Sequence, residues 1–272
     1  MEMIIEMMSY SFMVRAFIVG ILVSVCAALL GVSLVLKQYS MIGDGLSHVS
    51  YGALSIAVAC GVAPLKLSIP IVVIAAFVLL RMNENGAMKS DAAIAAMSAS
   101  ALAIGVTVTA LTTGITTDVC SYMFGSILAM SQEDVVLSVI LSIVVLLMYI
   151  FCYHYIFAVT FDESFARATG VKVSFFNTML SVLTAVTIVL GMQMMGAMLI
   201  SSLIIFPALS SMRLFKSFKG VIVSSGILAA VCFCIGMIVS YNYSTPAGAS
   251  VVLVNLCMFI LFWAIQKIRV LK

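Results

Sequence analysis

Residues 13–36 read MVRAFIVGILVSVCAALLGVSLVL, a run of 24 residues that contains a single charged side chain, Arg15. A helix needs about 20 predominantly apolar residues to cross the hydrocarbon core of a bilayer, so this run is long enough. Backbone groups in lipid must form their hydrogen bonds within a helix or a closed barrel, and the run lacks the alternating pattern of barrel strands. The stretch therefore predicts a membrane-spanning helix.

The rest of the chain has the same character. Of the 272 residues, 64 % are hydrophobic and 8 % are charged, against about 45–50 % and about 25 % in soluble domains. Polar or glycine-containing connectors divide the chain into nine apolar runs, at about 13–36, 45–60, 64–80, 91–115, 135–158, 173–191, 195–212, 221–240 and 247–265. The short runs at 45–60 and 64–80 form either a tight helical pair or a partly re-entrant segment. We therefore predict an all-α, polytopic membrane helical bundle with eight to nine transmembrane helices.

The first residues carry Glu2 and Glu6 but no Lys or Arg, so they lack the basic start of a cleavable signal peptide. We expect the whole chain, 1–272, to form a single transmembrane domain that begins with an amphipathic segment at 1–12. Small residues recur every four positions at Gly20, Ser24 and Ala28, and again at Ala92, Ala96 and Ser100. Such spacing lets helix backbones approach closely, so both runs are predicted to pack inside the bundle.

The basic residues indicate how the chain is oriented in the membrane. Eleven of the 13 Lys and Arg residues lie in five connectors, at 37–44, 81–91, 161–172, 213–219 and 266–272. Because cytoplasmic connectors carry an excess of Lys and Arg, we predict that these five and the C-terminus are cytoplasmic and that the N-terminus is extracytoplasmic. The basic residues form no stripe, which argues against a nucleic-acid partner.

Asp44 and His48 are the candidate metal ligands. They occur in SMIGDGLSH, residues 40–48, where the second apolar run begins, and their spacing of four places them on one helix face. Charged groups at membrane depth are costly and are functional candidates by default. A carboxylate oxygen and an imidazole nitrogen suit zinc, manganese or ferrous iron, and a two-fold axis would bring four such ligands together. The alternative is that Asp44 caps the helix and His48 packs in its first turn.

A second candidate segment, FDESFARATG at 161–170, lies between two spans. Asp162 is placed to cap the start of a short surface helix and Gly170 its end. In such a helix Phe161 and Phe165 would share an exposed apolar face that fits a partner protein. An interfacial helix lying on lipid headgroups explains the same pattern equally well.

The chain lacks the motifs of the enzymes that its size would otherwise permit. The nearest string to a phosphate-binding loop, GAMKS at 86–90, lacks the glycine before lysine, so the chain cannot itself be a P-loop ATPase. No GxSxG or HExxH string occurs. We expect no catalytic residues and no permanently bound cofactor.

Three motifs occur in order along the chain, GVSLVLKQYSMIGDGLSH at 31–48, FDESFARATGV at 161–171 and MGAMLISSLIIFP at 195–207. Together they resemble the permease subunits of bacterial ABC importers for zinc, manganese or iron, and the resemblance extends over about residues 12–266. The sequence departs from the usual pattern at 37–39, where two basic residues are common, and at 210–212, where alanines are common.

The resemblance implies a type II ABC importer permease fold in a bacterial cytoplasmic membrane. It implies that Asp44 and His48 coordinate the metal in the pathway. It also implies that the 161–170 segment is the coupling helix that docks on a separate cytoplasmic ATPase, through Phe161, Asp162, Glu163, Phe165, Ala166, Arg167 and Gly170. The other expected partners are an extracytoplasmic metal-binding protein and a second copy or homologue of the permease.

Two other functional classes remain open from the residues alone. A self-sufficient secondary carrier would need several ion-coupling residues within the membrane, and apart from Asp44 and His48 the spans have hardly any. An intramembrane enzyme is the weakest interpretation, because no nucleophile and base pair is recognisable. The sequence does not distinguish among zinc, manganese and iron.

Overall fold

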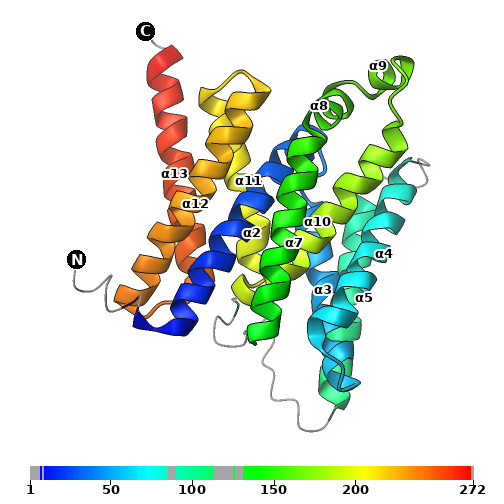
Figure 1. The fold of residues 1–272 in the computed structure, drawn as a ribbon, viewed down its shortest axis with the longest axis vertical. Coiled ribbons are helices and arrows are strands. Elements are labelled where there is room, and N and C mark those ends of the chain that lie inside the picture. Colours follow the sequence, from blue (N-terminus) through cyan, green and yellow to red (C-terminus); the bar gives the residue numbers. More distant parts are fainter. Residues whose placement is uncertain (1–6, 8, 85–89, 113–124, 126–130, 271–272) are drawn as a thin grey trace.

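The computed structural model describes residues 7, 9–84, 90–112, 125 and 131–270, and the regular elements in these ranges are helices (Figure 1). They are α2 (Ser11–Leu36), α3 (Ile42–Ala59), α4 (Pro64–Glu84), α5 (Ser90–Leu111), α7 (Gln132–Phe151), α8 (Tyr153–Phe161), α9 (Glu163–Ala168), α10 (Val173–Met195), α11 (Ala197–Leu214), α12 (Phe218–Tyr243) and α13 (Ala247–Val270). Eight of them are long and apolar enough to cross a membrane, namely α2, α4, α5, α7, α10, α11, α12 and α13. The predicted all-α, multi-pass membrane bundle is confirmed.

Helix α3 corresponds to the predicted span at 45–60, but it is not among these eight. Its polar residues, which include Asp44, Ser47 and His48, lower its hydropathy, and α4, α5, α10 and α11 pack around it. A polar helix is tolerated at membrane depth where protein rather than lipid surrounds it. The chain turns at Gly61, which has a φ of 66°, and continues directly into α4. The runs at 45–60 and 64–80 are therefore a tight helical pair.

The prediction of one span over 135–158 is wrong. The membrane helix α7 ends at Phe151, and Cys152 leaves the helical conformation before the short helix α8 begins. The apolar run is continuous through this break, so hydropathy alone cannot locate it. At the other end of α7, the Ser131 hydroxyl and the Asp134 carboxylate form a capping box.

Helix α2 lies at the centre of the bundle, where α7, α10, α11 and α12 pack against it (Figure 1). A Cβ atom at Gly31 would lie 2.0 Å from the backbone oxygen of Ile204, so the close crossing of α2 and α11 requires glycine there. Gly20, Ser24 and Ala28 are buried, as predicted. Ala92, Ala96 and Ser100 are exposed on α5, so the prediction that they pack inside this chain is wrong.

The basic connectors lie at one end of the molecule. The C-terminal end of α4, the connector that follows α11, the α9 segment and the C-terminal end of α13 are at the upper end of Figure 1, whereas α2 begins at the lower end. The arrangement therefore fits the predicted topology. We refer to the upper end as the cytoplasmic end, on the basis of its Lys and Arg residues.

Candidate metal and coupling sites

Asp44 and His48 lie in the first two turns of α3. The Nε2 atom of His48 is 3.8 Å from the Oδ2 atom of Asp44, and their side chains are 24 % and 52 % exposed, respectively. The N-cap residue of α3 is Met41, and no side chain caps this end of the helix. The alternative in which Asp44 is the helix cap is therefore wrong. The two candidate side chains lie on the same side of α3 and are both partly exposed.

Glycines on both sides of Asp44 bring neighbouring helices close to it. A Cβ atom at Gly45 would lie 2.5 Å from Ile94 of α5, and one at Gly43 would lie 3.0 Å from Ile204 of α11. Asp44 borders an open groove between α3 and α5, which is lined by Met41, Asp44, Asp91, Ile94, Ala95, Ser98 and Ala99. The groove gives the carboxylate an approach route from outside this chain.

Asp44 and His48 do not form a complete metal site in one chain. Within the described ranges, no three His, Cys, Asp or Glu side chains lie close enough together to hold a metal ion. A structural zinc site has four ligands, and a catalytic one has three plus a water molecule. One chain therefore offers two candidate ligands and leaves the remaining positions to water or another chain.

The coupling segment differs from the single helix predicted at 161–170. Phe161 is the last residue of α8, Asp162 is extended, and α9 contains only 163–168. As predicted, the Asp162 carboxylate accepts a hydrogen bond from the backbone of Phe165, at 2.9 Å, and caps α9. Gly170 has a φ of 87° and ends the segment in the left-handed conformation that glycine favours.

The prediction that Phe161 and Phe165 share one helix face is therefore wrong, because the two residues belong to different helices, although both side chains are exposed as predicted. The ring of Phe161 packs against Phe157 and Phe218, with centroid distances of 4.9 and 5.6 Å, and Phe165 is 65 % exposed on α9. Ala166 is fully buried against Val159 and Val173, where it holds α9 against the bundle. Arg167 is exposed. Of the predicted coupling residues, Phe165 and Arg167 are thus exposed on α9 itself.

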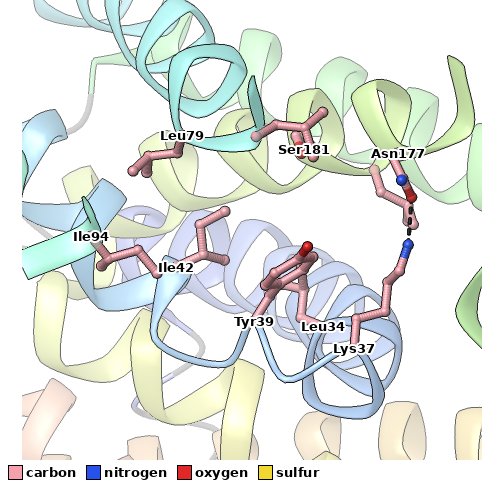
Figure 2. Close-up of a pocket in the computed structure, with 10 residues that line it drawn as sticks. Leu34, Lys37, Tyr39, Ile42, Leu79, Ile94, Asn177 and Ser181 are labelled. Carbon is pink, nitrogen blue, oxygen red and sulfur yellow. Dashed lines mark hydrogen bonds between the residues drawn. The ribbon is translucent and has the colours of Figure 1, made fainter. Parts of the chain in front are cut away.

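The sequence analysis missed a polar network that joins three helices at this end. The Nζ atom of Lys37, at the end of α2, lies 2.8 Å from the Oε1 atom of Glu163 on α9 and donates a hydrogen bond to the Oδ1 atom of Asn177 on α10 (Figure 2). The amide of Asn177 donates in turn to the same Oε1 atom, at 3.2 Å. Asn177 is the one amide side chain in the apolar run 173–191, and this isolated amide could have indicated a buried polar contact.

The network sets the ionisation of Glu163. Partial burial raises the pKa of this carboxyl, but the hydrogen bond and charge of Lys37, the hydrogen bond from Asn177 and the charge of Arg167 outweigh that effect. The pKa of Glu163 therefore lies below its ordinary value, and the carboxylate is charged at neutral pH. Lys37 and Glu163 thus form a stable ion pair.

Comparison with known proteins agrees with this architecture. The manganese import system permease protein ScaB of Streptococcus gordonii is 29 % identical over 272 residues, which cover 100 % of this chain and 98 % of that protein. The high-affinity zinc uptake system membrane protein ZnuB of Haemophilus influenzae is 28 % identical over 246 residues, which cover 90 % of this chain and 94 % of that protein.

A solved structure has the same arrangement of helices. The structure of PsaBC from Streptococcus pneumoniae in complex with Fab matches with a TM-score of 0.86 and 28 % identity, over 96 % of this chain and 94 % of that chain. The ABC 3 transport family matches residues 9–266, which include the complete bundle from α2 through most of α13. This chain therefore belongs to the ABC 3 transport family.

Proposed function

We propose that this chain is the membrane permease subunit of an ATP-driven importer of divalent transition metal ions, namely zinc, manganese or iron. The observation that carries the proposal is the Asp44–His48 pair, an oxygen and a nitrogen ligand 3.8 Å apart, of which Asp44 borders an open groove. Membership of the ABC 3 transport family and the relatives named for manganese and zinc support it.

The spacing of the pair suits one small cation. Two ligand atoms about 2.1 Å from an ion in tetrahedral geometry are about 3.4 Å apart. The observed separation of 3.8 Å exceeds that value only slightly, so a small side-chain rotation would bring both atoms onto the ion. The mixed oxygen and nitrogen set favours zinc, manganese and ferrous iron over calcium or magnesium.

The remaining ligands come from a second permease copy or a homologue. The face of α5 beside the groove carries exposed small residues, namely Ala92, Ala95, Ala96, Ala99 and Ser100, over which another helix backbone can pack closely. A two-fold axis beside this face would present Asp44 and His48 twice. A site shared between copies opens when the copies move, which transport requires because the ion must be released.

ATP hydrolysis takes place in a separate subunit that docks at the cytoplasmic end. Exposed Phe165 and Arg167 on α9 supply an apolar and a cationic contact for that subunit, and the aromatic cluster of Phe157, Phe161 and Phe218 lies nearby. An extracytoplasmic binding protein delivers the metal at the opposite end. The permease itself then contributes the pathway and no catalytic group.

The proposal is tested by metal uptake into cells that express matched amounts of each variant. Asp44→Ala and His48→Ala should each reduce uptake of manganese or zinc to background while the variants still assemble with the ATPase. His154→Ala removes the other histidine, which is exposed on α8, and should leave uptake normal. Normal uptake by both Asp44→Ala and His48→Ala would refute the site, and uptake that persists without the ATPase would indicate a secondary carrier instead.

A further inference from the structure

The Lys37–Glu163–Asn177 network lies between the two parts of the molecule that the proposed function must connect. Glu163 is on α9, the proposed docking helix, and Lys37 is the C-cap of α2, immediately before the connector to α3. Helix α9 packs against α8 and α10, whereas the Lys37–Glu163 ion pair links it to α2. A displacement of α9 therefore acts on the end of α2 through this pair.

The burial of Lys37 makes separation of the Lys37–Glu163 ion pair unfavourable. The side chain of Lys37 is 8 % exposed, and Asn177 is 6 % exposed. A buried ammonium group that loses its partner remains desolvated without compensation, which is strongly unfavourable. Lys37 therefore follows the carboxylate of Glu163 rather than separating from it.

The connector from Lys37 to Asp44 is a continuous hydrogen-bonded unit. The backbone N–H of Tyr39 donates to the oxygen of Leu34, and that of Gln38 donates to Val35, which ends α2 in a Schellman motif. The next N–H groups continue the chain of bonds, from Ile42 to the Tyr39 oxygen and from Gly45 to the Met41 oxygen. The first turn of α3, with Asp44, is thus tied through backbone bonds to the end of α2.

A cavity beside the connector gives it room to move. The cavity has a volume of about 30 Å³, and its lining includes Lys37, Tyr39 and Ile42 on the connector side and Leu79, Ile94 and Ser181 on the other helices (Figure 2). Tyr39 and Ile42 are therefore not closely packed on every side. The space is the size of one or two water molecules, so it admits a side-chain movement of Tyr39 or Ile42, and Ile42 lies in the same first turn of α3 as Asp44.

We propose that Lys37, Glu163 and Asn177 are the positioning residues through which displacement of α9 reaches the connector 37–41 and moves the Asp44–His48 pair. The inference rests on the proposed function, because it assigns the source of the displacement to the ATPase. It goes further in naming the side chains that convey the movement and the segment that responds. None of the three residues touches the metal in this mechanism.

The test is hydrogen–deuterium exchange in the assembled permease–ATPase complex, compared between the nucleotide-free state and the state trapped with ATP and vanadate. In the unmodified complex, peptides that cover 37–44 should change their exchange between the two states. Glu163→Gln removes the carboxylate charge with little change of shape, and exchange over 37–44 should then be the same in both states. Lys216→Glu reverses an exposed charge at the same end and should leave the response intact.

A charge exchange separates a specific link from general damage. Lys37→Glu alone should abolish the response, and Lys37→Glu with Glu163→Lys should restore it, because the Asn177 amide can donate to a carboxylate and accept from an ammonium group after a flip. The inference is overturned if exchange over 37–44 in the unmodified complex is insensitive to nucleotide. It is equally overturned if Glu163→Gln keeps the full response, or if the assembled charge-exchange variant shows none.

The result is independent of the metal site. Asp44→Ala leaves all three residues of the network in place, so its 37–44 peptides should respond to nucleotide as in the unmodified complex. If Asp44→Ala transports metal normally, the proposed metal site fails while the exchange result stands. If only Glu163→Gln behaves contrary to expectation, the network fails and the metal site stands.

Discussion

Two pairs of oppositely charged or ionisable side chains begin close together in the sequence, at Lys37 and at Asp44, yet they are built differently. Lys37 and Glu163 come from separate helices, lie 2.8 Å apart and share Asn177, and Lys37 is almost fully buried. Asp44 and His48 come from adjacent turns of one helix, lie 3.8 Å apart and are both partly exposed, and Asp44 borders a groove. The first pair is complete within the chain, whereas the second leaves both side chains partly exposed. The contrast separates a contact that holds helices together from the pair proposed to accept and release an ion.

The largest expected effect comes from Phe165→Asp on α9. Phe165 is 65 % exposed, so the change should not disturb the bundle, but it removes the apolar contact proposed for the ATPase. Full burial of one such side chain is worth about 1.5–3 kcal/mol, which corresponds to a loss of affinity of about 10- to 100-fold. Co-purification of the ATPase with the permease should therefore fall sharply. Phe215→Asp, at another exposed aromatic in the connector after α11, is the control, and equal retention of the ATPase by both variants would refute docking through α9.

A second expected effect concerns stability. Glu163→Gln leaves the buried ammonium of Lys37 without its counter-ion, whereas Asp44→Asn affects only the longer, more exposed 3.8 Å contact with His48. Loss of one partner from a fully buried pair costs about 3–5 kcal/mol. Because Glu163 is 43 % exposed, we expect a smaller cost of about 1–3 kcal/mol, which lowers the thermal midpoint by about 2–10 °C. Thermal unfolding of the purified permease should show this loss for Glu163→Gln and little change for Asp44→Asn, and the reverse order would contradict the comparison.

The same pair predicts a pH dependence. The folded state lowers the pKa of Glu163, so its contribution to stability is present above the pKa of the unfolded state, about 4.3, and is lost as pH falls through the folded-state pKa. The difference in thermal midpoint between the unmodified permease and Glu163→Gln should therefore be constant near neutral pH and shrink as the solution becomes more acidic than about pH 4. Glu133→Gln, at an exposed position in the first turn of α7, serves as the control. A difference that grew with acidity would show that the Lys37 contact does not stabilise the charged carboxylate.

The smallest expected effect is at the connector between the two pairs. Gln38 has a φ of 61°, which is unfavourable for a residue other than glycine by roughly 1–2 kcal/mol. Gln38→Gly relieves this strain but gives the unfolded chain more freedom, so the net gain should be less than about 1 kcal/mol. The thermal midpoint should rise slightly, whereas Gln38→Ala keeps the strain and should not raise it. A fall with Gln38→Gly would indicate that the glutamine side chain itself holds the connector.

Much of the fold could be predicted from the sequence because the membrane imposes it. Long apolar runs must be helices in lipid, and the positions of α2, α4 and α10 to α13 follow from that requirement alone. The break at Cys152 could not be predicted, because no glycine or proline marks it and the single histidine that follows, His154, is equally compatible with the interfacial end of a longer span. Small-residue spacing identified close packing in α2 but could not distinguish contacts within the chain from a face left open, as on α5.

The site could be predicted only in part for a similar reason. Asp44 and His48 are four residues apart, so helical geometry brings them together without any knowledge of the rest of the chain. Lys37, Glu163 and Asn177 are joined only by the packing of α2, α9 and α10, and no sequence spacing encodes such a contact. The Asp162 cap was recognisable, but the extended conformation that separates Phe161 from Phe165 was not.

The most direct test of the central claim is whether the imidazole of His48 coordinates the transported metal. Electron spin echo spectroscopy of Mn²⁺ bound to the purified permease detects a coordinated imidazole through its nitrogen modulation. The chain has two histidines, so the assignment needs only two variants. We predict nitrogen modulation in the unmodified permease and in His154→Ala, and its loss in His48→Ala. Absence of the modulation from the unmodified permease, or its persistence in His48→Ala, would contradict the assignment of Asp44 and His48 as the metal site.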